Sequence, residues 1–192
     1  MTRSGRIRFF YIGIFYFMEL LKLEKLTGYL DELVELLCDC VDSGASIGFL
    51  PPMSELEAQT YWLSVQDSID AHTSLMIIVK NEGKVVGSVQ ISLSAKSNAL
   101  HRCEVEKLMV LSSAQRQGIA TMLMQGVEKV AAAWQRTLIV LDTHTDSNAF
   151  NLYKQLGYIE VGTIPEYAKS ASGELTPTSI FYKTIDTTQE LI

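Results

Sequence analysis

The sequence is poor in the features that mark several common classes of protein. It has only three cysteines, Cys38, Cys40 and Cys103, and they form no CxxC or Cys/His spacing. Neither a disulfide framework nor a metal site is therefore predicted. We expect the three thiols to be small apolar side chains in a reducing compartment, which indicates the cytoplasm.

Basic residues are also in deficit. The chain has 16 Lys and Arg against 22 Asp and Glu, which gives a net charge of −6. Nucleic acid is therefore not expected as the main partner, because a phosphate backbone requires a basic surface. A small anionic cofactor is still compatible with this charge, since it needs only a local site.

Long apolar runs are scarce as well. The run from Phe9 to Met18 follows three arginines, as in a signal peptide, but no small-residue cleavage site follows it. It is far shorter than the ~20 residues that span a bilayer. We interpret residues 1–17 as an extension peripheral to the fold, with a docked segment or a membrane anchor as alternatives. Residues 18–186 are expected to form one domain, and residues 187–192 a C-terminal tail.

Motifs for nucleotide and ester chemistry are missing. The sequence contains no GxxxxGK[ST], no GxGxxG followed by an acidic residue, and no GxSxG. These absences argue against a nucleotide hydrolase, a dehydrogenase and a serine or cysteine nucleophile.

Hydrophobic spacing predicts the order β-α-α-β-β-β-α-β-α-β-β, a mixed α+β (α/β) domain around a central sheet. Helices are expected over residues 27–43, 54–69, 119–134 and 147–156, the second opened by a Ser54/Glu57 capping box. Strands are expected over residues 20–26, 75–79, 85–93, 102–111, 137–141, 158–163 and 179–185. The segment between the last two strands is rich in Pro, Gly, Ser and Thr, which predicts a loop.

A glycine stands where a predicted strand meets a predicted helix. Residues 115–123 read QRQGIATML, and a glycine at the start of a helix costs up to about 1 kcal/mol relative to alanine. A helix N-terminus binds anions, because its unpaired N–H groups carry a partial positive charge. Gly118 would let a phosphate approach the backbone, and Arg116 would add a charged donor. The alternative is that Gly118 only permits close packing of the helix on the sheet.

Two motifs resemble those of the GNAT N-acetyltransferases. VEKLMVLSSAQRQGIATMLM is similar to the acetyl-CoA motif Q/R-x-x-G-x-G/A after a strand, with Ala120 at the last small position. AFNLYKQLGY, residues 149–158, is similar to A-x-x-LY-x-x-x-GF/Y. The resemblance extends over residues 20–185 and implies a central mixed, mostly antiparallel twisted sheet flanked by helices. Within that family, residues 44–49, 89–93, 104–111, 141–143 and 164–184 resemble acetyltransferases of tabtoxin resistance, which act on a small amino-acid toxin.

The resemblance implies the residues that would bind acetyl-CoA. The pantetheine arm would pair with the backbone of Leu108, Met109 and Val110. The pyrophosphate would lie on the segment Gln115, Arg116, Gln117, Gly118, Ile119, Ala120 and Thr121. The family often has an asparagine seven residues before the motif tyrosine, Tyr153. That position is Asp146 here, and Asn148 lies out of register, so Asn148 and Tyr153 are candidate contacts.

Catalysis by direct transfer needs a base for the acceptor amine and an acid for the departing thiolate. Tyr153 is the candidate acid, and Asp142 and Glu104 are the candidate bases, all three implied by the resemblance. Asp142 could instead be a turn or capping residue. Strand alternation predicts that Glu104, Glu106, Leu108 and Val110 share one face. The two glutamates could bind an ammonium group there, or be no more than a solvated strand end.

These observations predict an acetyl-CoA-dependent N-acetyltransferase that acts on the primary amine of a small, amino-acid-like or toxin-like molecule. Two alternatives stay open. One is a non-catalytic acyl-CoA sensor, and the other is a protein or peptide N-acetyltransferase. A monomer or a homodimer is expected, with no metal.

Overall fold

A seven-stranded sheet forms the centre of residues 18–186, the part of the chain that the computed structural model describes. The strands are β1 (Met18–Leu23), β2 (Ser74–Asn81), β3 (Lys84–Leu93), β4 (Arg102–Val110), β5 (Leu138–His144), β6 (Ile159–Lys169) and β7 (Leu175–Thr184). They lie in the order β1-β2-β3-β4-β5-β7-β6, and only the β4–β5 pair is parallel. The mixed, mostly antiparallel sheet is therefore confirmed. The predictions for residues 1–17 and 187–192 lie outside the described residues.

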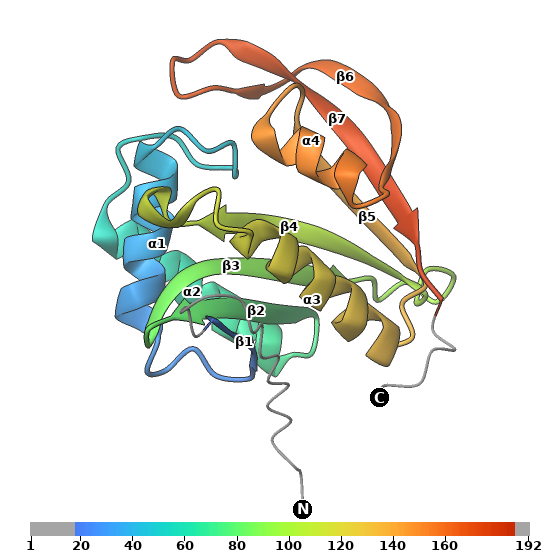
Figure 1. The fold of residues 1–192 in the computed structure, drawn as a ribbon, viewed down its shortest axis with the longest axis horizontal. Coiled ribbons are helices and arrows are strands. Elements are labelled where there is room, and N and C mark those ends of the chain that lie inside the picture. Colours follow the sequence, from blue (N-terminus) through green and yellow to red (C-terminus); the bar gives the residue numbers. More distant parts are fainter. Residues whose placement is uncertain (1–17, 187–192) are drawn as a thin grey trace, which may run out of the picture.

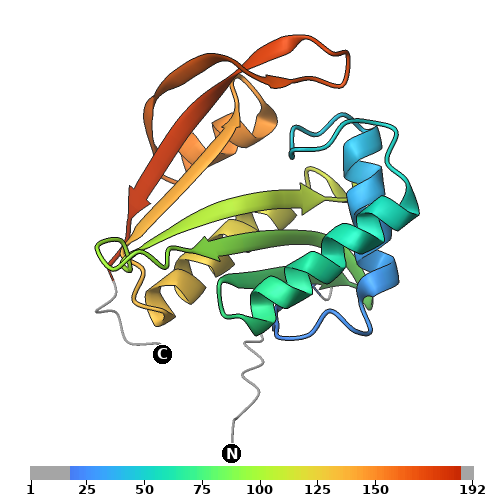
Figure 2. The same cartoon turned by 180° about the vertical axis from the view of Figure 1, so that it is seen from behind.

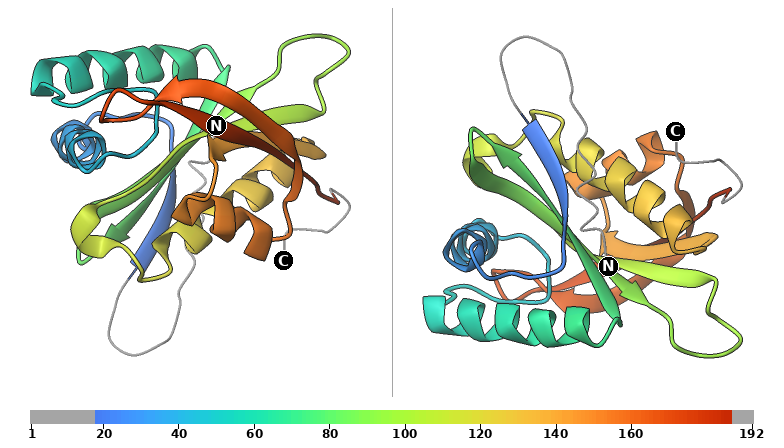
Figure 3. Two further views of the ribbon diagram at one scale, coloured as in Figure 1. Left: turned by 90° about the horizontal axis from the view of Figure 1, so that it is seen from above. Right: turned by 90° about the horizontal axis from the view of Figure 1, so that it is seen from below.

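Two pairs of helices cover the two faces of the sheet. They are α1 (Leu30–Asp42) and α2 (Glu55–Asp70) on one face, and α3 (Ile119–Ala133) and α4 (Asn148–Gln155) on the other. Figure 1 shows α3 and α4 in front of the sheet, Figure 2 shows α1 and α2 from behind, and Figure 3 shows the layers end-on. The capping box is confirmed, since Ser54 Oγ accepts from the Glu57 N–H at 3.2 Å and the Glu57 carboxylate accepts from the Ser54 N–H at 3.0 Å.

Each face of the sheet has its own hydrophobic core. Ile77 and Val89 point to α3, where they pack with Leu123, whereas Met76 and Ile78 point to α1 and α2. The apolar face of α3 is buried from Ile119 to Ala131 except at Met122, which is half-buried. Trp134, at the C-terminal end of the helix, is 36% exposed beside Lys22. Trp134 is thus not a core residue, because it caps the helix at the sheet edge.

The alternation predicted for β4 is wrong, because a β-bulge interrupts it. Glu106 pairs with Gln90 and Met109 pairs with Ser88, so Lys107 and Leu108 both stand opposite Val89. Lys107 has a left-handed φ of 52°. The extra residue reverses the faces. Glu104 and Glu106 therefore point to the α1/α2 side, while Leu108 and Val110 pack against the core on the α3 side.

The loop predicted between residues 163 and 179 is also wrong. β6 continues to Lys169, and β7 begins at Leu175. The register between them shifts near Gly162 and again between Ile164 and Ala168. These irregularities accommodate Pro165, which has no N–H to donate and is tolerated in an edge strand. Long-range pairing with β7 has overridden the turn-like composition.

None of the helices within residues 18–186 has the length and apolar character needed to cross a membrane.

Candidate active site

The site is organised by the parallel pair β4 and β5. The ladder joins Arg102–Val105 of β4 to Leu138–Leu141 of β5 and stops there, although β4 runs on to Val110 and β5 to His144. Figure 1 shows the two strands diverging towards the end of β4. Leu108, Met109 and Val110 thus have a strand partner only on the β3 side within the described part of the chain. Their other backbone edge has no strand partner among the described residues and is open to an extended ligand, except that the Val110 carbonyl accepts a hydrogen bond from Cys40 Sγ at 3.6 Å.

The turn before α3 has the features of an anion-binding site. Gly118 is the N-cap residue of α3 and has a left-handed φ of 81°, and the cap makes no side-chain hydrogen bond. A Cβ added at Gly118 would meet nothing within 4 Å. Close packing therefore does not explain this glycine, whereas its backbone conformation does. The N–H groups of Ile119, Ala120 and Thr121 are the first-turn donors that have no partner inside a helix.

Hydrogen bonds to α1 fix the segment before this turn, and the positive charge of Arg116 is exposed at the surface of the turn. Asp39 of α1 accepts hydrogen bonds from the Ser112 N–H and Oγ, both at 2.7 Å, which fixes the end of β4 to α1. Gln115, Arg116 and Gln117 are exposed, and Arg116 also has a left-handed φ, of 64°. Its Nη1 donates to Asn148 Oδ1 at 3.4 Å. The predicted cofactor residues Arg116 and Asn148 are therefore brought together.

The predicted carboxylates gather on the α1/α2 side of the sheet. Leu141 is buried in the core on the α3 side, so its neighbour Asp142 points to the same side as Glu104 and Glu106. Loss of hydration raises the pKa of Glu104, and the charges of Glu106 and Asp142 raise it further. Loss of hydration also raises the pKa of Asp142, against a smaller opposing effect of Lys107. These carboxylates therefore share one negatively charged space.

Asp142 is not the turn or capping residue of the alternative interpretation. It lies inside β5, opposite Ile180 of β7. The cap of α4 is Ser147, whose Oγ accepts from the Phe150 N–H at 3.0 Å. His144 is the last residue of β5 and is half-buried.

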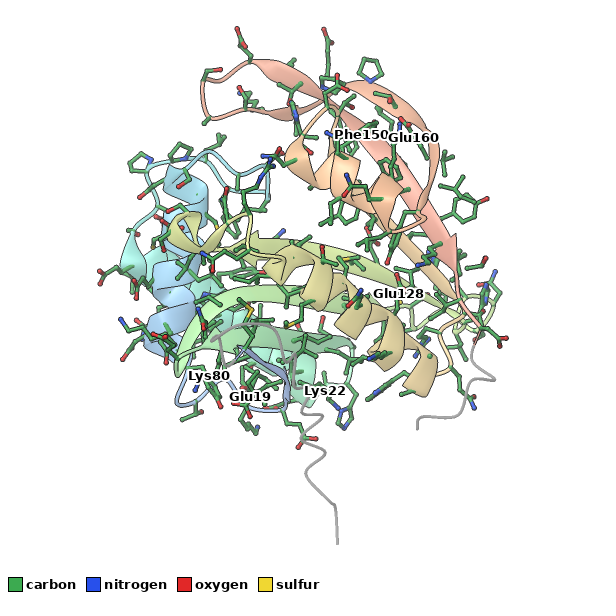
Figure 4. All side chains as sticks on the ribbon, in the orientation of Figure 1. Glu19, Lys22, Lys80, Glu128, Phe150 and Glu160 are labelled. Carbon is green, nitrogen blue, oxygen red and sulfur yellow. The ribbon has the colours of Figure 1, made fainter. Side chains whose placement is uncertain are left out.

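Tyr153 is held rigidly in α4. It is 4% exposed, and its ring lies 5.7 Å from that of Tyr158 and 6.0 Å from that of Phe181. Phe150 packs edge-on against Phe181 of β7, with ring centroids 5.3 Å apart, and Lys154 forms an ion pair of 3.0 Å with Glu160 of β6. These two contacts hold α4 against β6 and β7; Phe150 and Glu160 are labelled in Figure 4. Burial, and then the charge of Asp142, raise the pKa of Tyr153 strongly. The phenol therefore stays protonated at neutral pH.

Sequence reasoning missed residues on the carboxylate side. Tyr61 of α2 accepts a hydrogen bond from Gln90 Nε2 at 2.7 Å, and Phe49 packs edge-on against Tyr61 at 5.1 Å. Lys107 lies over the Phe49 ring, with Nζ 5.7 Å from the ring centroid. Residue spacing carries no signal for these contacts, because they join β3, β4, α2 and a loop.

Three features lie together in this site: a diverging parallel strand pair, an open helix N-terminus beside it, and a buried tyrosine near Asp142. Residues 30–158, more than half of the chain, match the acetyltransferase (GNAT) family. The chain belongs to this family and is an acetyl-CoA-dependent N-acetyltransferase.

Solved structures of the same fold include several acetyltransferases. An N-acetyltransferase from Staphylococcus aureus Mu50 is 15% identical, with 86% of this chain and 98% of that chain covered and a TM-score of 0.72. A protein from Salmonella typhimurium, solved with its cofactor acetyl-CoA, is 12% identical, with 88% and 95% covered and a TM-score of 0.73. A ribosomal-protein-alanine N-acetyltransferase from Brucella melitensis is 18% identical, with 86% and 99% covered and a TM-score of 0.72. At these identities the likeness is one of fold.

Proposed function

We propose that this enzyme transfers the acetyl group of acetyl-CoA directly to the primary amine of a small, amino-acid-like or toxin-like molecule. The observation that carries the proposal is the position of Asp142, Glu104 and Glu106 on one side of the sheet, close to the point where β4 and β5 separate. An acceptor ammonium group would be attracted to this space by its negative charge. The expected site of action is the cytoplasm, since Cys38, Cys40 and Cys103 are free thiols.

The residues for holding acetyl-CoA are those of the free strand edge and the α3 turn. The open N-terminus of α3 and the space above Gly118 suit a pyrophosphate, with Arg116 as a charged donor and Asn148 as its partner. The edge of Leu108, Met109 and Val110 suits the amides of a pantetheine arm. Acetyl-CoA supplies the acetyl group as a thioester.

The proton transfers are assigned to two kinds of side chain. Asp142 or Glu104 accepts a proton from the acceptor ammonium, and their raised pKa brings them closer to the pH at which a base works best. Tyr153 keeps its proton at neutral pH and donates it to the sulfur as charge develops there. The reaction then needs no covalent enzyme intermediate.

Two measurements test this function. Calorimetry measures acetyl-CoA binding, and release of the CoA thiol is then followed over a panel of amino acids, β-lactam-like analogues, other small amines and peptides. Turnover of small amines supports the proposal. Binding without turnover on any amine would favour an acyl-CoA sensor, and turnover restricted to peptides would favour a protein N-acetyltransferase.

A further inference from the structure

A cation lies among the carboxylates of the acceptor side. Strict alternation along β4 would direct Lys107 away from Glu106, to the α3 side. The bulge instead places Lys107 on the α1/α2 side, where its Nζ lies over the ring of Phe49. A lysine with a left-handed φ of 52° is an uncommon conformation that the surrounding structure must enforce. β-Bulges often occur beside active sites, where they redirect a side chain.

The ammonium group of Lys107 has no carboxylate partner within ion-pair distance in residues 18–186. Its neighbours are the Phe49 ring, at 5.7 Å, and Gly48, where an added Cβ would lie 3.3 Å from Nζ. Lys107 nevertheless lies near enough to Asp142 to influence that carboxyl group. It is thus a positioned cation whose hydrogen-bond donors are available to a ligand.

A second donor also contacts Phe49. The Tyr61 hydroxyl accepts its hydrogen bond from Gln90, so its own proton is left to donate. Gln90 is buried and stands directly opposite Glu106 across the strand pair, which places Tyr61 at the edge of the same space. Phe49 contacts both Tyr61 and Lys107.

We propose that Lys107, assisted by Tyr61, binds a carboxylate group of the acceptor, so that the acceptor is an α-amino acid or a close analogue with a carboxylate beside its amine. Opposite charges are then matched on both sides: the ammonium faces Asp142 and Glu104, and the carboxylate faces Lys107. This assignment rests on the proposed function. The alternative for Lys107 is a structural one, in which it only holds the loop of Gly48 and Phe49 against β4.

Matched pairs of acceptors separate these two roles. The probes are L-methionine, L-phenylalanine and L-lysine, each with its methyl ester and with the amine that lacks the carboxylate. The kcat/KM for each probe is measured by CoA thiol release in the wild type, Lys107→Met, Lys107→Arg and Phe49→Leu. The quantity compared between variants is the ratio of kcat/KM for amino acid over ester. The two amines differ in basicity, but this difference is the same for every variant and cancels in the comparison.

We expect Lys107→Met to lower this ratio roughly ten- to a hundredfold, the usual effect of one charge-assisted hydrogen bond. Lys107→Arg should keep the ratio within about threefold, because the charge is preserved. Phe49→Leu retains the charge and should lower kcat/KM for both members of a pair alike. Circular dichroism and melting curves confirm that each variant is folded.

Two results would overturn the assignment. Equal losses for amino acid and ester in Lys107→Met would show a structural role only. A wild type that turns over the amine lacking the carboxylate as efficiently as the amino acid itself would exclude a carboxylate site. Failure of every probe to turn over, with acetyl-CoA binding intact, would instead overturn the small-amine function on which the assignment rests.

Discussion

Arg116 Nη1 donates a hydrogen bond of 3.4 Å to Asn148 Oδ1, and this contact joins the turn before α3 to the first residue of α4. The residue that would bind a pyrophosphate is thereby connected to the helix that carries Tyr153. The contact therefore brings the N-termini of α3 and α4 together at the proposed cofactor site.

Reversal of the charge at Arg116 is expected to weaken the cofactor site. Arg116→Glu should raise the KM for acetyl-CoA at least about tenfold, as loss of a charge-assisted contact does, and leave kcat at saturation within about threefold. Lys96→Glu, an equal charge change in an exposed loop, is the control. Equal KM values for the two variants in steady-state kinetics would remove Arg116 from the cofactor site.

Gly118 is expected to matter through its backbone conformation. Because φ is 81° and a Cβ would have free space, Gly118→Ala should cost about 1–2 kcal/mol of unfolding free energy. Gly118→Asn should cost less, since asparagine adopts the left-handed region more readily than alanine. Urea denaturation measures both. If alanine and asparagine cost the same, the conformation is not the reason for this glycine.

The same substitution at two neighbouring tyrosines is expected to lower kcat at one position and not at the other. Tyr153→Phe is expected to lower kcat by roughly a hundred- to ten-thousandfold with little change in acetyl-CoA affinity, because it removes the proposed proton donor. Tyr158→Phe is the matched control, because the Tyr158 hydroxyl is buried and has no hydrogen-bond partner among the described residues. Its removal should leave kcat unchanged and the melting temperature equal or higher. A normal kcat for Tyr153→Phe would contradict the acid role.

Because the pKa of Asp142 is raised, we expect removal of its charge to increase the stability of the protein and to decrease its activity. Between the ordinary pKa of the carboxyl group and its higher folded value, the folded state binds more protons than the unfolded state. Stability of the wild type therefore falls as the pH rises through that window. The Asp142→Asn variant has no carboxyl group to ionise here, so this fall in stability is absent. Its melting temperature should therefore exceed that of the wild type at neutral pH but not in acid below the ordinary pKa of aspartate.

The Asp142→Asn variant should also have a lower kcat/KM, because the amide that replaces the carboxylate does not accept a proton. Glu174→Gln, in the exposed turn between β6 and β7, is the control for removal of a carboxylate. A melting difference for Asp142→Asn that is independent of pH would show that Asp142 is not a carboxylate of raised pKa.

The sequence alone determined those features that depend on neighbouring residues. The order of helices and strands, the Ser54/Glu57 capping box and the glycine at the α3 junction all follow from apolar spacing and from the backbone preferences of single residues. The two motifs around Gly118 and Tyr153 were sufficient to predict the family, since each lies within one local unit of structure.

Only the tertiary structure decided the face of each side chain on β4 and the composition of the acceptor side. The bulge at Lys107 depends on how β4 pairs with β3, and β4 contains no glycine from which it could be predicted. The same holds for β6, where pairing with β7 overrides a turn-like composition, and for the contact of Phe49 with Tyr61 and Lys107. Pairing register and contacts between distant elements are set by the free energy of the whole packed sheet, which local patterns do not contain.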